Sequence, residues 1–422
     1  MRAAAETVPS TQDGGRAVTI SETGPDQQQE VREYPFGPPE RLHLHPMYRW
    51  LQEHEALSRV RLAYGEDTWL VVRHEDARAV LADPRFSRAM ALSRDMPRMS
   101  PDQPRANLLD MDPPDHSRIR RLLAKAFTSR RVEQLRPRAQ QIADGLLDAM
   151  VAAGPPADLM DAFAVPFPST VVNEMLGVTV DDRGQFRRWS EALLSTTALT
   201  PQQRAEYVGN LSAYMAGMVE QRRREPMDDL LGAMVAARDE QDRLSEHELI
   251  EVSVGLLAAG FETTTTQIGN FVYALLTNPD QLALLRSRPE LVADAVEELM
   301  RFIPLTAGAP MARYATEDVQ LSGGVVRAGD PVLVHRAAAS RDPAVFPDPD
   351  RLDLTRGASP HLGFGHGIHH CLGAQLARME LQVALSSLLG RFAGLRLAVD
   401  ETDLRWKTGM ALRGLRVLPI AW

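Results

Sequence analysis

The sequence predicts a mainly α-helical protein with small β-sheets at its edge, built as one large domain. Helical periodicity dominates residues 116–303. No Pro/Gly/Ser-rich linker, internal repeat or change of composition follows residue 33, although 422 residues would on average make two or three domains. Strand-like pieces lie at 58–64 and 69–74 around a turn at 65–68, at 310–334 and near the C-terminus.

Residues 1–32 differ in character from residues 33–422. The first segment is polar and rich in Gln, Ser, Thr and Gly, so we expect it to be disordered. It lacks the apolar core of a signal peptide. The longest apolar stretch, around Val252 to Phe261, is far shorter than the ~20 residues that a membrane helix needs. We therefore expect a soluble, cytoplasmic protein whose folded domain spans residues 33–422.

A long helix is predicted in the middle of the chain. Ser245 followed by Glu248 forms a capping box, and Asn278 before a proline is a stop signal. The stretch between them spans about 32 residues, or roughly 48 Å, enough to cross a domain. Gly260 in its middle costs about 1 kcal/mol relative to Ala, and the β-branched run Thr263–Thr266 adds to that cost. Either another helix packs closely at Gly260, or something else must approach the helix there.

The only cysteine, Cys371, lies in a glycine-rich stretch, Phe364–Gly373. A single thiol has no disulfide partner, and the amphipathic pattern that follows it predicts a helix. A thiolate near a helix start, wrapped by glycines, is a candidate metal ligand with a lowered pKa. Two alternatives remain: the thiol is a small buried hydrophobe, or it binds zinc with nearby histidines. The zinc alternative lacks a second ligand cluster. The nearby histidines are His361, His366, His369 and His370.

The spacing Phe-x-x-Gly-x-x-x-Cys-x-Gly, formed by Phe364, Gly367, Cys371 and Gly373, resembles the haem-ligand loop of the cytochrome P450 monooxygenases. The resemblance implies the cytochrome P450 fold and haem b as cofactor. It makes Cys371 the axial ligand of the iron, with Phe364, Gly365 and Gly373 beside the cofactor. A thiolate ligand pushes electron density to the iron and favours cleavage of the O–O bond.

Within the long helix, Ala259–Thr263 resembles the oxygen-activation segment of this family. The resemblance implies that Ala259 and Gly260 leave room over the haem face. It also implies catalytic roles for Glu262 and Thr263, an acid and a hydroxyl that relay protons to bound dioxygen.

Glu298 and Arg301 are three residues apart and share a helix face. A lone pair of this kind is usually a weak surface ion pair. This one falls about 70 residues before Cys371, just ahead of Pro304, and resembles the buried Glu-x-x-Arg pair of the family. The resemblance implies a structural role with Arg351 as third member, although Leu352 stands where the family has an aromatic residue.

A further helix predicted from about Asp115 places His116 and Arg120 on one face. Singly, such residues are usually solvated surface charges. Together with Arg313 and His369 they match the positions that bind the haem propionates in the family, and buried propionates need cationic or N–H partners.

The net charge of −9 does not suggest a nucleic-acid ligand, yet the segment 118–131 is basic. We interpret it as a docking patch for an acidic electron donor; an ordinary solvated helix face is the alternative. The chain has neither a G-x-G-x-x-G motif nor cysteines for an iron–sulfur cluster, so electrons must come from a separate ferredoxin and ferredoxin reductase. We expect a monomer. The basic residues are Arg118, Arg120, Arg121, Lys125, Arg130 and Arg131.

The segment 87–112 is long, interrupted by prolines and rich in Met, which suits a lid or binding loop over a large apolar ligand, with disorder as the alternative. The candidate pocket residues are mostly small or aliphatic, which implies a roomy apolar pocket. They are Met90, Leu194, Leu199, Leu305, Ala307, Met410 and Leu412.

The segments Tyr34–Phe36, Gly363–Gly367 and Leu404–Trp406 resemble those of actinobacterial P450 enzymes that tailor macrolide and other polyketide antibiotics. The resemblance predicts hydroxylation and/or epoxidation of a macrolide with one oxygen atom from O2. Alternative substrates are a terpenoid, a peptide-bound aromatic or a xenobiotic. A non-catalytic haem or zinc sensor is an alternative from another class.

Overall fold

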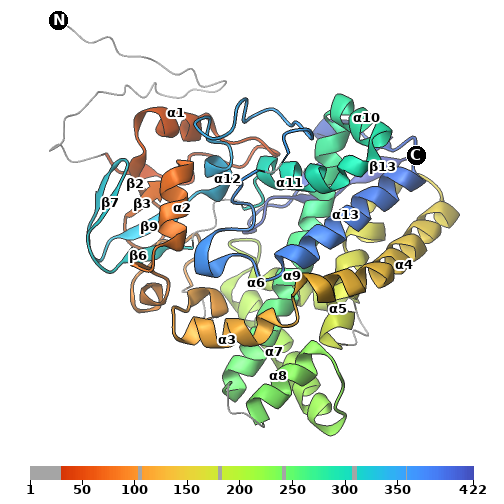
Figure 1. The fold of residues 1–422 in the computed structure, drawn as a ribbon, viewed down its shortest axis with the longest axis horizontal. Coiled ribbons are helices and arrows are strands. Elements are labelled where there is room, and N and C mark those ends of the chain that lie inside the picture. The colour runs from red at the N-terminus through yellow and green to blue at the C-terminus, as the bar shows by residue number, and fades with distance from the viewer. Residues whose placement is uncertain (1–29, 103–106, 179–182, 240–243, 307–310, 358) are drawn as a thin grey trace, which may run out of the picture.

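A computed structural model describes residues 30–102, 107–178, 183–239, 244–306, 311–357 and 359–422. Helices dominate it, as predicted, and the strands are short (Figure 1). The helices are α1 (Pro46–His54), α2 (His74–Ala82), α3 (Asp115–Ala124), α4 (Ser129–Ala153), α5 (Pro166–Leu176), α6 (Arg183–Leu193), α7 (Pro201–Arg224), α8 (Leu230–Asp239), α9 (Glu246–Leu276), α10 (Pro279–Ser287), α11 (Val292–Phe302), α12 (Arg336–Ala339) and α13 (Ala374–Arg391). No helix among the described residues is long and apolar enough to cross a membrane.

Within the described residues, the strands form one sheet of six strands and three smaller ones. The large sheet has the order β1-β2-β3-β9-β6-β4, with parallel β1–β2 and β3–β9 pairs. A second sheet has the order β10-β13-β5, and β7–β8 and β11–β12 are two-stranded. The bounds are β1 (Arg32–Glu33), β2 (Leu57–Arg61), β3 (Thr68–Val71), β4 (Phe86–Ser87), β5 (Ala157–Asp158), β6 (Arg313–Ala315), β7 (Val319–Leu321), β8 (Gly324–Val326), β9 (Pro331–Val334), β10 (Arg396–Leu397), β11 (Arg405–Trp406), β12 (Leu415–Val417) and β13 (Pro419–Ala421).

The strands β2 and β3 confirm the first predicted strand pair, and β6–β9 fall within the predicted stretch 310–334. The two-residue strands β4 and β5 were not foreseen, because two residues carry no alternation signal. The tail predicted over residues 1–32 lies outside the described residues up to residue 29. Arg32 at its end is already part of β1, where it pairs with Val60 of β2.

Helix α9 begins and ends where the sequence indicated. Its capping box is formed: the Ser245 hydroxyl accepts from the Glu248 amide over 3.1 Å, and the Glu248 carboxylate accepts from the Ser245 amide over 2.7 Å. The helix is 31 residues long and most of its second half is buried. The largest core cluster surrounds it, with apolar side chains from α4, α5, α11 and α13. It therefore forms a rigid central support for the residues in its middle.

Candidate active site

The loop that carries Cys371 runs from the short 3-10 turn Gly367–His369 into α13 (Figure 1). The Cys371 amide donates to the Phe364 carbonyl oxygen over 2.8 Å and closes the loop. Gly367 has a φ of +72°, and a Cβ there would lie 2.3 Å from the Leu81 carbonyl oxygen of α2. Glycine is therefore required at this position. Gly365 also has a positive φ, and Gly373 is the N-cap of α13.

The Cys371 side chain is exposed, yet burial is the largest influence on the pKa of its thiol. The exposure of the side chain and the effect of burial are compatible for a thiol that lies deep in the protein and borders an internal space. Burial raises the pKa above its usual value, while the Gly373 amide and the cations Arg336, Arg120 and Arg378 oppose the rise. The lowered pKa expected at a helix start is thus wrong, since desolvation of the thiolate outweighs the helix terminus. A metal ion at Sγ would supply the missing positive charge.

Three of the four predicted propionate partners meet beside this loop. The His116 ring lies 4.5 Å from the His369 ring, and the Arg313 guanidinium lies 3.2 Å from His369 Nδ1. His369 Nε2 lies 2.9 Å from the Met111 carbonyl oxygen, so Nε2 carries the proton and Nδ1 accepts from Arg313. Burial, with Arg313 nearby, lowers the pKa of His369 to about 4. Arg120, the fourth, donates to the His370 carbonyl oxygen over 2.5 Å.

This cluster has an excess of buried positive charge. Burial lowers the pKa of Arg313 to about 10, and in the part of the chain that the structure describes no carboxylate is ion-paired with Arg313, Arg120 or Arg336. Buried His116 Nε2 has no hydrogen-bond partner. Uncompensated cations and an orphaned ring nitrogen suit a ligand with two carboxylates beside a thiolate-bound metal, as in haem. Sequence reasoning missed Arg336, whose guanidinium would lie 3.7 Å from a Cβ on Gly365.

The middle of α9 supplies the predicted catalytic pair. Ala259 is exposed although it follows buried Ala258 near the centre of this buried helix, which is expected where a helix borders an internal space. The Thr263 hydroxyl donates to the Ala259 carbonyl oxygen over 2.6 Å. Glu262 is buried and forms an ion pair with Lys407, a residue that the sequence did not single out.

Gly260 faces a neighbouring helix. A Cβ on Gly260 would lie 2.9 Å from Cγ2 of Val172 on α5. Of the two readings that the sequence left open for Gly260, this contact favours close helix packing, which sets the distance between α5 and α9.

The Glu298–Arg301 pair is buried, with exposed fractions of 1% and 0% for the two side chains. Arg301 binds both carboxylate oxygens and also donates to the Ser340 and Pro349 carbonyl oxygens. Glu298 also forms an ion pair with the guanidinium group of Arg356, over 3.2 Å. The predicted third member, Arg351, accepts from Arg301 through its backbone carbonyl.

Most predicted pocket residues gather around the turn between β11 and β12. Ala411 donates its amide to the Leu194 carbonyl oxygen over 2.7 Å, and Leu412 bridges to Thr306, next to Leu305. The Leu199 amide donates to the Ser195 hydroxyl in the same α6–α7 connection. Met90 packs on a separate cluster over the large sheet, and Ala307 lies outside the described residues.

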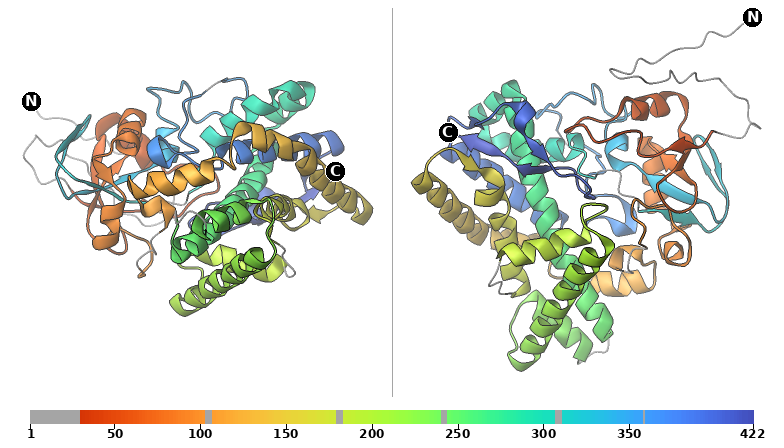
Figure 2. Two further views of the ribbon diagram at one scale, coloured as in Figure 1. Left: turned by 60° about the horizontal axis from the view of Figure 1, so that its bottom comes forward. Right: turned by 180° about the vertical axis from the view of Figure 1, so that it is seen from behind.

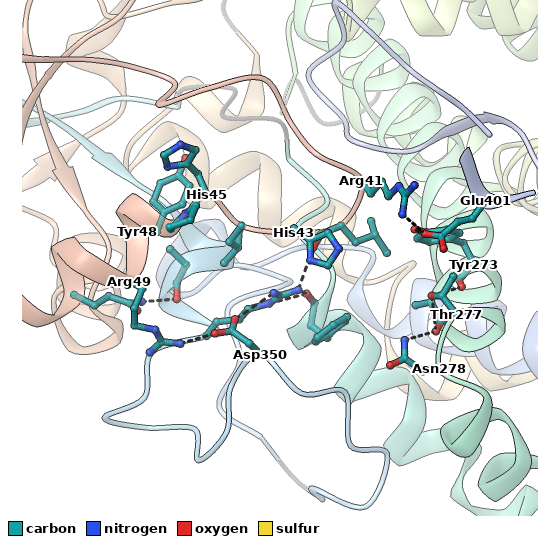
Figure 3. Close-up of a pocket in the computed structure, with 18 residues that line it drawn as sticks. Arg41, His43, His45, Tyr48, Arg49, Tyr273, Thr277, Asn278, Asp350 and Glu401 are labelled. Carbon is teal, nitrogen blue, oxygen red and sulfur yellow. Dashed lines mark hydrogen bonds and ion pairs between the residues drawn. The ribbon is translucent and has the colours of Figure 1, made fainter. Parts of the chain in front are cut away.

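A cavity of about 650 Å³ lies away from Cys371, between the segment before α1 and the end of α9 (Figure 3). Its charged side chains pair with one another, as in Arg41 with Glu401 and Arg49 with Asp350. It contains neither the thiol nor the Glu262–Thr263 pair, and we do not assign the active site to it. Among the described residues, no group of three or more His, Cys, Asp or Glu side chains could hold a metal ion, as a zinc site would require.

Comparisons with known proteins agree with this geometry. The cytochrome P450 family model matches residues 196–403. Mycinamicin IV hydroxylase/epoxidase of Micromonospora griseorubida is 54% identical over 393 residues, which cover 93% of this chain and 99% of that protein. Nocardicin C N-oxygenase of Nocardia uniformis is 53% identical over 395 residues, with the same coverage. The crystal structure of the LnmA cytochrome P450 hydroxylase of Streptomyces atroolivaceus superposes with a TM-score of 0.87 at 52% identity, covering 93% of this chain and all of that one.

The chain therefore belongs to the cytochrome P450 family. It is a monooxygenase whose cofactor is a haem iron.

Proposed function

We propose that this enzyme adds one oxygen atom, as a hydroxyl or an epoxide, to a macrolide or related polyketide of antibiotic biosynthesis. The observation that carries the proposal is the 54% identity to mycinamicin IV hydroxylase/epoxidase along almost the whole of both chains. 6-Deoxyerythronolide B hydroxylase, 41% identical over 94% of its length, supports the same substrate class. The aliphatic residues around the β11–β12 turn suit a large apolar ligand.

A second candidate is oxygenation of a nitrogen atom. It is favoured by nocardicin C N-oxygenase, whose 53% identity to this chain is close to that of the macrolide enzyme. A family fold hosts many substrates, so the pocket rather than the scaffold decides between them.

A spectral titration tests the substrate class. We expect mycinamicin-type macrolides to shift the haem absorption from the low-spin to the high-spin form and to yield an oxygenated product with a surrogate electron donor. A nocardicin-type β-lactam, a terpenoid and an aromatic xenobiotic serve as comparison ligands. A full shift and product from one of these, with no response to macrolides, would overturn the proposed substrate.

We assign each predicted residue of the site a role in binding the cofactor or in moving protons. Haem b, when bound, supplies the activation of dioxygen and the insertion of one oxygen atom. Cys371 would hold the iron. Glu262 and Thr263 would hold and pass protons, and residues 33–422 would act as one haem-thiolate domain. The remaining cofactor contacts would come from His116, Arg120, Arg313 and His369 for the propionates, and from Ala259, Phe364, Gly365 and Gly373 around the ring.

We further propose that a ferredoxin, reduced by its reductase, docks beside the Cys371 loop and that the enzyme works as a cytoplasmic monomer. The predicted basic segment is only partly available for docking. Arg118 is ion-paired with Glu248 on α9, and Arg120 turns inward to His370. The exposed cations on α3, directly after it and at the start of α4 support the proposal; they are Arg121, Lys125, Arg130 and Arg131.

Reversing the charge of Arg121, Arg130 and Arg131 to Glu should slow reduction by a ferredoxin by about tenfold or more at low salt, because steering of the donor is lost. Stopped-flow reduction measures the rate, and spectral titration should show unchanged substrate affinity. The control exchanges Arg396 and Arg416, exposed on the C-terminal strands, for Glu. Equal reduction rates in both variants would contradict docking on this patch.

A further inference from the structure

Lys407 occupies a buried position against the predicted acid of the relay. It directly follows β11, and its ammonium group forms an ion pair with Glu262 and lies 3.2 Å from the Thr266 hydroxyl oxygen. The side chains of Lys407 and Glu262 are 5% and 1% exposed. Removing one partner from such a pair leaves a buried charge uncompensated. Lys407 therefore holds the Glu262 side chain in its observed place.

Lysine is rare in this chain, which makes its use at this position informative. Of the 47 Lys and Arg residues, two are lysines, and the other, Lys125, is exposed directly after α3. An arginine offers a permanently charged, planar fork, whereas a lysine offers a compact charge that fits beside one carboxylate oxygen. The pairing uses one oxygen of Glu262: the other, Oε2, is buried and has no hydrogen-bond partner.

The β11–β12 hairpin is fixed to α9 at this point. A Cβ on Gly414 would lie 2.4 Å from Cγ2 of Thr266, so only glycine lets the hairpin approach this closely. The side-chain amide of Asn270 donates to the Arg413 carbonyl oxygen over 2.9 Å. Figure 2 shows the C-terminal strands, in dark blue, beside the green helix α9. A movement of the hairpin would therefore move Lys407 relative to Glu262.

The tip of the same hairpin is bound to the α6–α7 connection, residues 194–200. The Gly409 carbonyl oxygen faces the amides of Thr196, Thr197 and Ala198 at 2.8, 3.0 and 3.0 Å. Gly409 has a φ of +66°, and a Cβ there would lie 2.6 Å from the Ala198 nitrogen. Most of the predicted pocket residues, Met90 and Ala307 excepted, thus lie near one end of a hairpin whose other end holds Glu262.

The charges around Glu262 come from two elements, the β11–β12 hairpin and α6. Burial raises the pKa of the Glu262 carboxyl, the Lys407 ammonium lowers it, Glu191 on α6 raises it and Arg187 on α6 lowers it. Removal of the ammonium would raise this pKa further. Any step that needs ionised Glu262 would then fail at a higher pH than in the wild type.

We propose that Lys407 is a positioning residue that couples the α6–α7 connection to Glu262, so that a substrate seated at the hairpin tip adjusts the acid that serves the proton relay. The inference rests on the proposed function in two respects, that the pocket lies at this tip and that Glu262 serves the proton relay.

The variants Lys407→Met, Lys407→Arg and, as matched control on the same hairpin, exposed Arg405→Met test the role. With Lys407→Met we expect product per electron pair to fall by about tenfold and hydrogen peroxide to replace it. The loss is smaller than the ~10²–10⁴-fold typical of removing a proton-transfer group, because Lys407 acts through Glu262. Thr263→Ala sets the scale of full uncoupling.

The pH dependence of the coupling, the product formed per electron pair, gives a further readout. The acid limb of this profile should move to higher pH, and Lys407→Arg should restore part of the coupling. Spectral substrate affinity should stay within about twofold. A Lys407→Met variant with wild-type coupling and pH profile would overturn the proposal.

A second readout needs no turnover. Protein with ζ-15N-labelled lysine gives two side-chain signals, assigned with Lys125→Arg. We expect a saturating ligand, whichever class the titration identifies, to shift the Lys407 signal and leave that of Lys125 unchanged. Glu262→Gln should also shift the Lys407 signal. A Lys407 signal unmoved by a bound ligand would contradict the coupling, whereas a failure of macrolides to bind the wild type would contradict the proposed substrate alone.

Discussion

Cys371→His should give a folded protein that no longer inserts oxygen. The backbone holds the loop, since the Cys371 amide bonds to the Phe364 carbonyl oxygen and Gly367 makes the turn against α2. The side chain itself is exposed to an internal space, so an imidazole or a hydroxyl replaces the thiol without displacing core residues. What disappears is the thiolate, whose electron density favours O–O cleavage.

The experiment compares Cys371→His and Cys371→Ser with the wild type. Thermal unfolding monitored by circular dichroism should give cooperative transitions for all three. Product formation with a surrogate donor should fall in both variants to the level given by free haem. Wild-type product formation by either variant would contradict a role for the thiolate in the chemistry.

The second large effect concerns stability. Arg301→Met should lower the free energy of unfolding by about 3–5 kcal/mol, the cost of breaking a buried ion pair by removing one partner. Such a loss is a large share of the ~5–15 kcal/mol that stabilises a typical domain. The substitution leaves Glu298 with Arg356 alone and strands the Ser340 and Pro349 carbonyl oxygens, which Arg301 now satisfies.

Urea unfolding measures this loss, with Arg61→Met as control. Arg61 pairs with Asp67 at the surface, and its removal should leave the unfolding midpoint almost unchanged, because exposed ion pairs contribute little to stability. If Arg301→Met does not accumulate as folded protein, Arg301→Lys, which keeps the charge but loses the planar fork, provides the comparison. Equal unfolding midpoints for an Arg301 variant and the Arg61 variant would contradict a structural role for the buried pair.

The local features of this chain were readable in its sequence. The bounds of α9 follow from Ser245, Glu248 and Pro279, because caps and breakers act within a few residues. The glycine loop and its thiol were found for the same reason. The rest depends on contacts between distant segments. Lys407 meets Glu262 across 145 residues, and no periodicity reports such a pairing.

Some sequence-based predictions were wrong because they depend on how deeply a side chain is buried and on which distant residues it contacts in the folded protein. A helix start alone predicted a lowered pKa for Cys371, but the depth of the thiol reverses the direction. Six basic residues formed one cluster in sequence, yet Arg118 and Arg120 are turned to partners on α9 and in the Cys371 loop. The Pro349–Arg356 segment presents Arg356 to Glu298, because the chain turns between Arg351 and Arg356.

The proposed chemistry requires Cys371 to bind the haem iron as a thiolate. The absorption spectrum of the reduced protein under carbon monoxide tests it most directly. We expect the long-wavelength Soret band typical of thiolate-ligated haem in the wild type and its loss in Cys371→His. A wild-type Soret band at the shorter wavelength typical of histidine-ligated haem would contradict it.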